Sequence, residues 1–173
     1  CKLIFASTDA VYPDNHDEVN EDSMHNPVGN YGLYKSEIEN TFQEHQNFFI
    51  ARFSYVVGSD KFSSYLANNR KENKIIYNGF SRRAVTINDV VQGLYGYNKI
   101  HKSINFCGPE LLSRMDIAKM YKKNLFHDLM LNSEDAPDEF WLPRAKTINM
   151  GSIYFDSVLG RASENINTYL KEI

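Results

Sequence analysis

A tyrosine and a lysine four residues apart are the side chains in this sequence best suited to proton chemistry. Residues 31–46 are predicted to form a helix, and positions four apart share one helix face, so Tyr31 and Lys35 are expected to point the same way. A free phenol titrates at about 10, and a neighbouring ammonium group favours the phenolate. Such a pair could exchange a proton with an alcohol or a ketone, although surface helices also carry it by chance.

Two hydroxyls, Ser7 and Thr8, precede this helix in the chain. They follow the apolar run at 2–6, which is predicted to be a buried parallel strand, and Asp9 comes directly after them. Open α/β sheets bind ligands beyond the carboxyl ends of their strands. A hydroxyl at this point is therefore expected to face a ligand.

Segments typical of strands and helices alternate along the chain, so the predicted fold class is α/β with a largely parallel sheet in the first half. Further strands are predicted at 48–57, 74–77, 84–87 and 103–106, the middle two around the turn Asn78-Gly79. Further helices are predicted at 62–72, 89–97, 114–124, 152–159 and 163–173. Ser113 and Asp116 resemble a capping box, and residues 11–30 are expected to form a loop with solvated acidic residues at 14–22.

Composition excludes several classes of protein. The chain has 173 residues, 13% of them aromatic, which is too many for a disordered tail. The net charge is −3 without a basic stripe, so no nucleic acid partner is expected, and no apolar run has the length of a membrane span. The five histidines show no metal-site spacing, so no metal is expected. Cys1 and Cys107 lie far apart, which predicts a reduced, cytoplasmic protein.

The order of the motifs resembles the extended short-chain dehydrogenase/reductases, the superfamily of the NAD-dependent sugar-nucleotide epimerases and dehydratases. The resemblance rests on S-T-D-A-V-Y at 7–12, E-D-x-x-x-x-P-x-x-x-Y-G-x-x-K at 21–35, A-R-F-S-Y-V-V-G at 51–58, R-x-x-x-x-x-x-D at 82–89 and G-x-x-x-x-S at 108–113. Within the superfamily, the S-T-D loop is most similar to the dTDP-4-dehydrorhamnose reductase branch.

The resemblance implies the C-terminal portion of a Rossmann-type doubly wound parallel sheet plus a small α/β substrate-binding lobe. Residues 1–58 and 84–99 would belong to the dinucleotide-binding domain, and residues 59–83 and 100–173 to the lobe. The nine glycines do not form the superfamily's glycine-rich turn, which the resemblance places ahead of Cys1. We therefore expect this sequence to be part of a longer product and to bind NAD(P) poorly by itself.

The resemblance also implies which residues are catalytic. Tyr31 would donate a proton to the keto oxygen of a sugar. Lys35 would hold the nicotinamide ribose and keep the pKa of the phenol low. Thr8 would orient the carbonyl group of the substrate, with Ser7 as the substitute if the register shifts by one residue.

Other residues would bind the cofactor or the substrate. Ser7, Tyr31, Lys35, Phe53 and Ser54 would contact NADP or NAD. Thr8, Asp9, Tyr55 and Arg82 would contact the substrate, Arg82 (or its neighbour Arg83) through a diphosphate. At 141–144 the sequence reads W-L-P-R where relatives often carry R-P, so Leu142 replaces an arginine for which Arg144 could compensate.

The implied function is NAD(P)H-dependent reduction of a 4-keto nucleotide sugar by a cytoplasmic enzyme that could be a homodimer. Two alternatives stay open: a nucleotide-sugar 4-epimerase or dehydratase, and a non-catalytic regulatory or binding subunit of the same fold. The presence of Thr8, Tyr31 and Lys35 together favours an enzyme.

Overall fold

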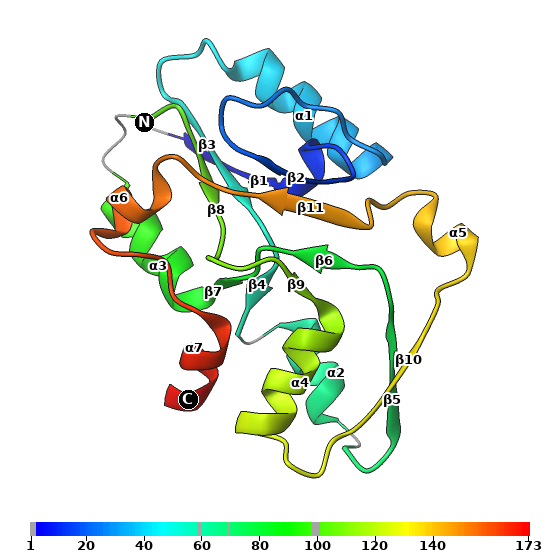
Figure 1. Ribbon diagram of the computed structural model, residues 1–173. Helices are drawn as coiled ribbons and strands as arrows, with labels where there is room; N and C mark the ends of the chain where they lie inside the picture. The colour runs from blue at the N-terminus through cyan, green and yellow to red at the C-terminus, as the bar shows by residue number, and fades with distance from the viewer. Residues whose placement is uncertain (1–2, 59, 69, 98–100) are drawn as a thin grey trace.

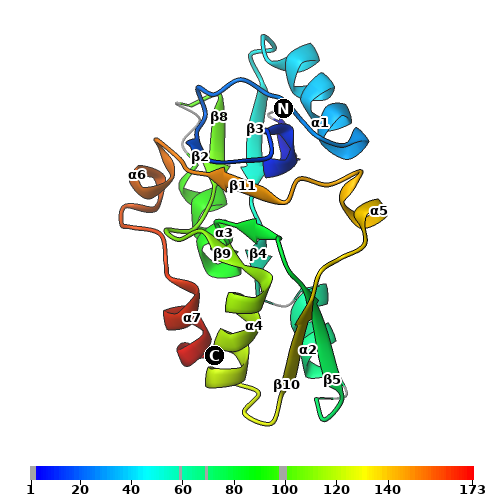
Figure 2. The same ribbon diagram turned by 45° about the vertical axis from the view of Figure 1, so that its right-hand side comes forward.

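Three parallel strands form the first sheet of the computed structural model, which describes residues 3–58, 60–68, 70–97 and 101–173. The strands lie in the order β1 (Leu3–Thr8), β3 (Phe48–Phe53), β8 (Ser103–Phe106). Buried apolar side chains fill β3, as expected for a strand covered on both faces. Helix α1 (Asn30–Phe42) lies beside this sheet in both views (Figures 1 and 2).

Strand β8 departs from the predicted division of the chain. Its residues are expected in the substrate-binding lobe, but the whole strand pairs in parallel with Ile50–Phe53 of β3. The expected boundary at residue 100 therefore does not separate β8 from the sheet of β1 and β3. The rest of the division stays a prediction.

A second sheet brings together short segments from both ends of the chain. It has the order β2 (Asn15–Val19), β11 (Thr147–Met150), β6 (Ser81–Arg82), β9 (Leu112–Ser113). The expectation of a structureless loop at 11–30 is thus wrong, because β2 pairs with β11. The acidic side chains at 14–22 are exposed as expected, apart from the half-buried Glu21. The Asp14 carboxylate also accepts hydrogen bonds from the backbone N–H groups of Lys146 and Thr147 at 2.9 and 2.8 Å.

Two further strand pairs complete the sheets of the described residues. Strand β4 (Val56–Val57) pairs with β7 (Val85–Thr86), and β5 (Asn73–Tyr77) pairs with β10 (Met130–Glu134). The strands predicted on either side of Asn78-Gly79 therefore have different partners and do not form a hairpin. The strand predicted at 48–57 is two strands in the structure, because β3 ends at Phe53 and β4 begins at Val56.

The other helices are short. They are η1 (Asp9–Val11), α2 (Lys61–Ala67), α3 (Ile87–Gly96), α4 (Arg114–Asn124), α5 (Asp138–Trp141), α6 (Phe155–Leu159) and α7 (Ile166–Glu172). The capping box of α4 is confirmed: the Asp116 N–H donates to Ser113 Oγ at 3.1 Å, and the Ser113 N–H donates to Asp116 Oδ2 at 3.0 Å. A helix long and apolar enough to cross a membrane does not occur in the described part of the chain.

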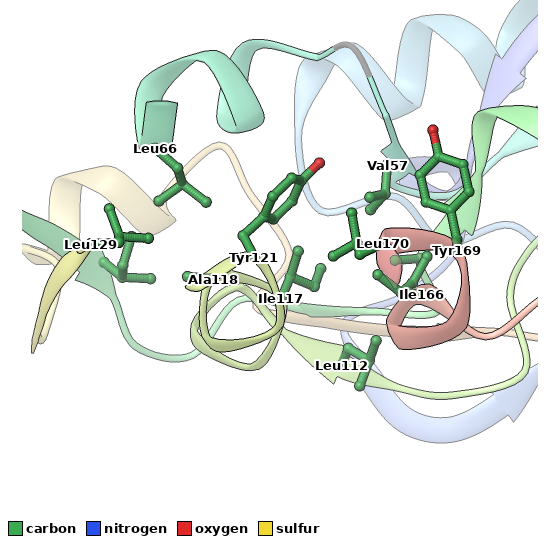
Figure 3. Close-up of a cluster of buried hydrophobic side chains, with 12 residues drawn as sticks. Val57, Leu66, Leu112, Ile117, Ala118, Tyr121, Leu129, Ile166, Tyr169 and Leu170 are labelled. Atoms are coloured by element: carbon green, nitrogen blue, oxygen red, sulfur yellow. The ribbon is translucent and has the colours of Figure 1, made fainter. Parts of the chain in front are cut away.

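Buried apolar side chains form separate clusters, each packed between different helices and strands. One cluster packs α2, α4 and α7 around β4 and includes Leu66, Tyr121 and Leu170 (Figure 3). A second fills the space under β3 and β8, where Phe106 contacts Phe155 of α6. The α/β class and the Rossmann-type parallel sheet predicted from the sequence are confirmed.

Candidate active site

The hydroxyl loop begins where β1 ends. Thr8 pairs with Phe53 in the parallel register of β1 and β3, so the carboxyl ends of both strands meet at one edge of the sheet. Thr8 caps the short helix η1: its Oγ1 accepts from the Ala10 N–H at 3.2 Å and donates to Asp9 Oδ1 at 3.3 Å. Ser7 Oγ is buried without a hydrogen-bond partner among the described residues. An unsatisfied buried hydroxyl at a strand end can be satisfied by a bound ligand.

The tyrosine and the lysine lie on the side of α1 that borders this loop. Lys35 Nζ donates to the Ala6 carbonyl oxygen at 2.8 Å and lies 5.8 Å from the centroid of the Tyr31 ring. The Tyr31 side chain is exposed to solvent. The ammonium group is thus held at the end of β1, with an accessible phenol beside it.

Two glycines allow α1 to approach the loop closely. A Cβ atom on Gly32 would lie 2.0 Å from the Ala10 carbonyl oxygen, and one on Gly29 would lie 2.2 Å from the Pro143 carbonyl oxygen. No side chain fits at either distance. Gly32, the second residue of the Y-G-x-x-K motif, therefore sets the distance between the helix and the Thr8–Ala10 turn.

A buried ion pair fixes the same helix to the sheet. Arg52 of β3 donates to Glu39 Oε2 of α1 through Nε at 2.9 Å and through Nη2 at 2.7 Å, and both residues are buried. Arg52 Nη1 also donates to the Tyr12 hydroxyl at 2.8 Å. These contacts hold Tyr31 and Lys35 at a fixed position relative to the strand ends.

Asp9 and Arg82, which are both predicted to bind the substrate, contact each other. Arg82 Nε lies 3.2 Å from Asp9 Oδ2, and the same carboxylate oxygen accepts from Ser54 Oγ at 3.2 Å. Burial raises the pKa of the Asp9 carboxyl above its ordinary value, and the neighbouring Arg82 guanidinium partly opposes this shift.

Backbone carbonyl groups occupy most of the remaining donors of Arg82. Its Nη1 donates to the Ser81 and Lys146 carbonyl oxygens at 2.7 and 2.9 Å, and its Nη2 donates to the Ala145 carbonyl oxygen at 2.9 Å. Arg83 donates to Asn149 Oδ1 at 2.7 Å and pairs with Glu18. Both arginines therefore have protein partners, and their predicted contacts with a diphosphate stay predictions.

The aromatic residues predicted at the site lie in two environments. The Phe53 ring packs against Phe106 with centroids 4.9 Å apart, within the apolar cluster of the first sheet. The Tyr55 ring contacts Phe62 and Phe80 beside the apolar cluster of α2, α4 and α7, and its hydroxyl is buried without a hydrogen-bond partner in the described chain. Burial raises the pKa of Tyr55 above its ordinary value.

A cavity of about 410 Å³ opens beside Tyr31. It is lined by Ala10, Val28, Gly29, Asn30, Tyr31, Gly32, Phe80, Arg82, Pro143, Arg144 and Ala145. A volume of this size suits a small organic ligand. Among the described residues there is no group of three or more His, Cys, Asp or Glu side chains that could hold a metal ion.

The sequence analysis did not identify Phe80 and Arg114 as parts of the site. The Phe80 ring lies under the guanidinium groups of both Arg82 and Arg114, at 4.2 and 4.1 Å from its centroid. The position of Arg114 in the sequence could have indicated its importance. A cation in the first turn of a helix interacts unfavourably with the helix dipole, so another contact is expected to compensate.

Solved structures share this architecture, although no protein-family model and no curated protein matches the sequence. The class that these structures define for this chain is the Rossmann-type α/β fold.

Individual structures define the likeness more closely. A dTDP-4-dehydrorhamnose reductase from Clostridium acetobutylicum superposes with a TM-score of 0.81 at 18% identity, covering 99% of this chain and 64% of that chain. The same enzyme from Bacillus anthracis, solved with NADP, gives 0.79 at 18% identity, over 99% of this chain and 64% of that one. A UDP-glucuronic acid 4-epimerase from Bacillus cereus, solved with UDP-glucuronic acid and NAD, gives 0.74 at 20% identity, over 98% and 59%.

These similarities confirm the fold that the sequence motifs implied. The chain spans 64% of the length of the two reductases and 59% of the epimerase. At such low identity the likeness establishes the fold, and the activity of the whole protein is a matter for proposal.

Proposed function

We propose that this chain supplies the catalytic and substrate-binding part of an NAD(P)H-dependent enzyme that reduces a 4-keto nucleotide sugar. The observation that carries the proposal is the placement of Tyr31 and Lys35: α1 holds both at the end of β1, next to the cavity of about 410 Å³. The reductases and the epimerase that share the fold are nucleotide-sugar enzymes, which supports the substrate class.

Tyr31, Lys35 and Thr8 each have a separate role in the proposed reduction. The Tyr31 phenol donates a proton to the keto oxygen as charge develops on it, and the Lys35 ammonium beside the ring favours the phenolate that remains. Thr8 donates a hydrogen bond to the same oxygen and orients it, and Asp9 and Tyr55 border the substrate. A bound nicotinamide supplies the hydride.

The described residues fit the nicotinamide end of NADP or NAD. The orphaned Ser7 hydroxyl and the Lys35 ammonium provide polar groups at the end of β1, and Phe53 ends the neighbouring strand β3, directly before Ser54. The sequence contains no glycine-rich turn for the pyrophosphate, so we expect the chain to bind the cofactor weakly when separated from a segment that supplies one. A cytoplasmic location and a homodimer complete the proposal.

Substitution of the phenol tests the proposal in the complete native protein. Tyr31→Phe is expected to lower kcat for reduction of a dTDP-linked 4-keto deoxyhexose by about 100-fold or more, because the general acid is lost while the ring remains. Nicotinamide absorbance with NADPH and NADH gives the rate.

Tyr34→Phe is the matched control, because Tyr34 is as exposed as Tyr31 on the same helix and has no assigned role. Its kcat should stay within about twofold of the wild type, since surface substitutions have small effects. Equal rates for Tyr31→Phe and the wild type would overturn the mechanism. Interconversion of sugar epimers without net oxidation of NAD(P)H would assign the protein to the epimerases instead, and absence of any turnover would favour a binding subunit.

A further inference from the structure

Arg114 is a partly buried arginine whose side chain has no polar partner among the described residues. Its Nε is shielded from solvent and makes no hydrogen bond, and its guanidinium forms no ion pair with any described residue. Each of the other arginines has a carboxylate or carbonyl partner, namely Arg52, Arg70, Arg82, Arg83, Arg144 and Arg161. Burial lowers the pKa of Arg114, which reflects the cost of holding this charge away from water.

Aromatic rings surround this guanidinium. Its central carbon lies 4.1 Å from the centroid of Phe80, 5.7 Å from Phe62 and 5.9 Å from Tyr55. Ring faces attract a cation but leave its N–H donors without acceptors. The nearby Asp60 carboxylate does not lie within ion-pair distance of Arg114. Its Oδ1 accepts from the Ser63 N–H of α2 at 2.5 Å, and its Oδ2 is buried without a hydrogen-bond partner among the described residues. An acceptor for the Arg114 donors is therefore missing from the described chain.

The unpaired guanidinium lines a second cavity of about 320 Å³, together with Lys61, Phe62, Tyr65, Ile75, Ile76, Tyr77 and Phe140. This cavity adjoins the one beside Tyr31 through two contacts. Phe80 lines the first cavity and lies against Arg114, and Arg144 lines the first cavity while its guanidinium lies 4.5 Å from the Phe140 ring. A substrate whose keto carbon is at Tyr31 could thus extend past Arg144 toward Arg114.

We propose that Arg114, together with Arg144, binds the phosphate groups of the nucleotide-sugar substrate, and that Arg82 does not. The inference rests on the proposed function. It follows from the contrast between two side chains: the donors of Arg82 are occupied by Asp9 and three carbonyl groups, whereas the Arg114 side chain has no acceptor among the described residues. In the same part of the chain, Arg144 has a single carbonyl partner, that of Phe140. Phosphate oxygens would accept hydrogen bonds from the Arg114 guanidinium group and balance a cluster in which arginine charges repel one another.

Nucleotide binding by the complete native protein tests this assignment. Arg114→Gln is expected to raise the Kd for dTDP and for UDP at least about tenfold, measured by isothermal titration calorimetry, and to reduce the salt dependence of binding. Arg114→Lys should restore part of the affinity, because it returns the charge without the planar fork. Arg70→Gln is the matched control and should leave both Kd values unchanged, since Arg70 pairs with Asp128 at the surface.

Thermal stability separates a ligand contact from a structural role. Because the Arg114 side chain has no hydrogen-bond or ion-pair partner to lose in the described part of the chain, Arg114→Gln without nucleotide should melt at or above the wild-type temperature, and only its stabilisation by dTDP should diminish. A variant that loses stability and binding together would overturn the proposal, as would unchanged nucleotide affinity. If the wild type binds neither dTDP nor UDP and reduces no keto sugar, the proposed function fails as well, whereas a failure confined to Arg114→Gln leaves it intact.

Discussion

Asp9 and Arg82 show how burial can turn charged side chains that would suit a ligand into partners of each other. Both are charged side chains of the kind that bind sugar nucleotides, and the motif resemblance assigns them to the substrate. In the structure each is buried against the other, with Ser54 and three carbonyl groups as further partners. A buried pair of this kind stabilises the position of η1 relative to β6 before any substrate arrives.

Removal of one partner should therefore reduce stability. Asp9→Asn is expected to lower the free energy of unfolding by about 3 kcal/mol, because it leaves the Arg82 charge buried without a counterion. Urea denaturation monitored by fluorescence measures the change. Asp17→Asn, at an exposed position of β2, should have almost no effect. Loss of activity in Asp9→Asn with unchanged stability would instead indicate direct contact with the substrate.

Helix α1 is the element that determines the geometry of the candidate site. The Arg52–Glu39 pair attaches it to β3, and Gly32 lets it approach Ala10. The helix has little apolar surface turned inward, and the described residues buried on it are Gly32, Ser36 and Glu39. Its position depends on these polar contacts and on close backbone approach rather than on a continuous apolar stripe.

A methyl group at Gly32 should consequently displace the helix. In an isolated helix, alanine is more stable than glycine by about 1 kcal/mol. Here Gly32→Ala is expected to destabilise the protein by roughly 1–3 kcal/mol, because the new Cβ would meet the Ala10 carbonyl oxygen at 2.0 Å. Asn40→Ala, at an exposed position of the same helix, should keep or slightly raise stability. Chemical denaturation of both variants measures the change in the free energy of unfolding. A stabilising Gly32→Ala would contradict the close approach of α1 to Ala10.

Over the whole molecule, burial of weakly acidic side chains links stability to pH. Burial raises the pKa of Cys107, Tyr12 and Tyr97 to about 12 in each case. Tyr97 belongs to the apolar cluster of β3 and β8, and Tyr12 and Cys107 belong to a third buried cluster with Ile148 and Met150 of β11. These side chains therefore reach water only when the packing of the sheets is lost.

The free energy of unfolding is expected to fall as pH rises above about 9. Between their unfolded and folded pKa values these groups keep their protons in the folded protein and release them on unfolding, so alkaline pH favours the unfolded chain. Each group contributes up to about 1.4 kcal/mol per pH unit within that interval. Urea titrations at neutral and alkaline pH, with tyrosine absorbance as the probe of ionisation, measure the effect. A constant free energy of unfolding across this range would contradict it.

Much of the local structure could be predicted from the sequence. Strand β8 lies where it is predicted, at Ser103–Phe106, and the capping box starts α4, because apolar runs and Ser-x-x-Asp patterns act through neighbouring residues. The strands β10 and β11 could not be found in this way. Each is short and only partly apolar, and each is stabilised by hydrogen bonds to a strand that is distant in sequence.

The sequence by itself determined the α/β fold class and the spacing that puts Tyr31 and Lys35 on one side of a helix, since helical periodicity is a local property. Only the tertiary structure decided which charges are paired. Asp9 meets Arg82, Asp14 binds the backbone at Lys146, and the Arg114 side chain meets no acceptor among the residues that the structure describes. The physical reason is that an ion pair or a buried orphan depends on which distant segments pack together, and that packing follows from the fold as a whole.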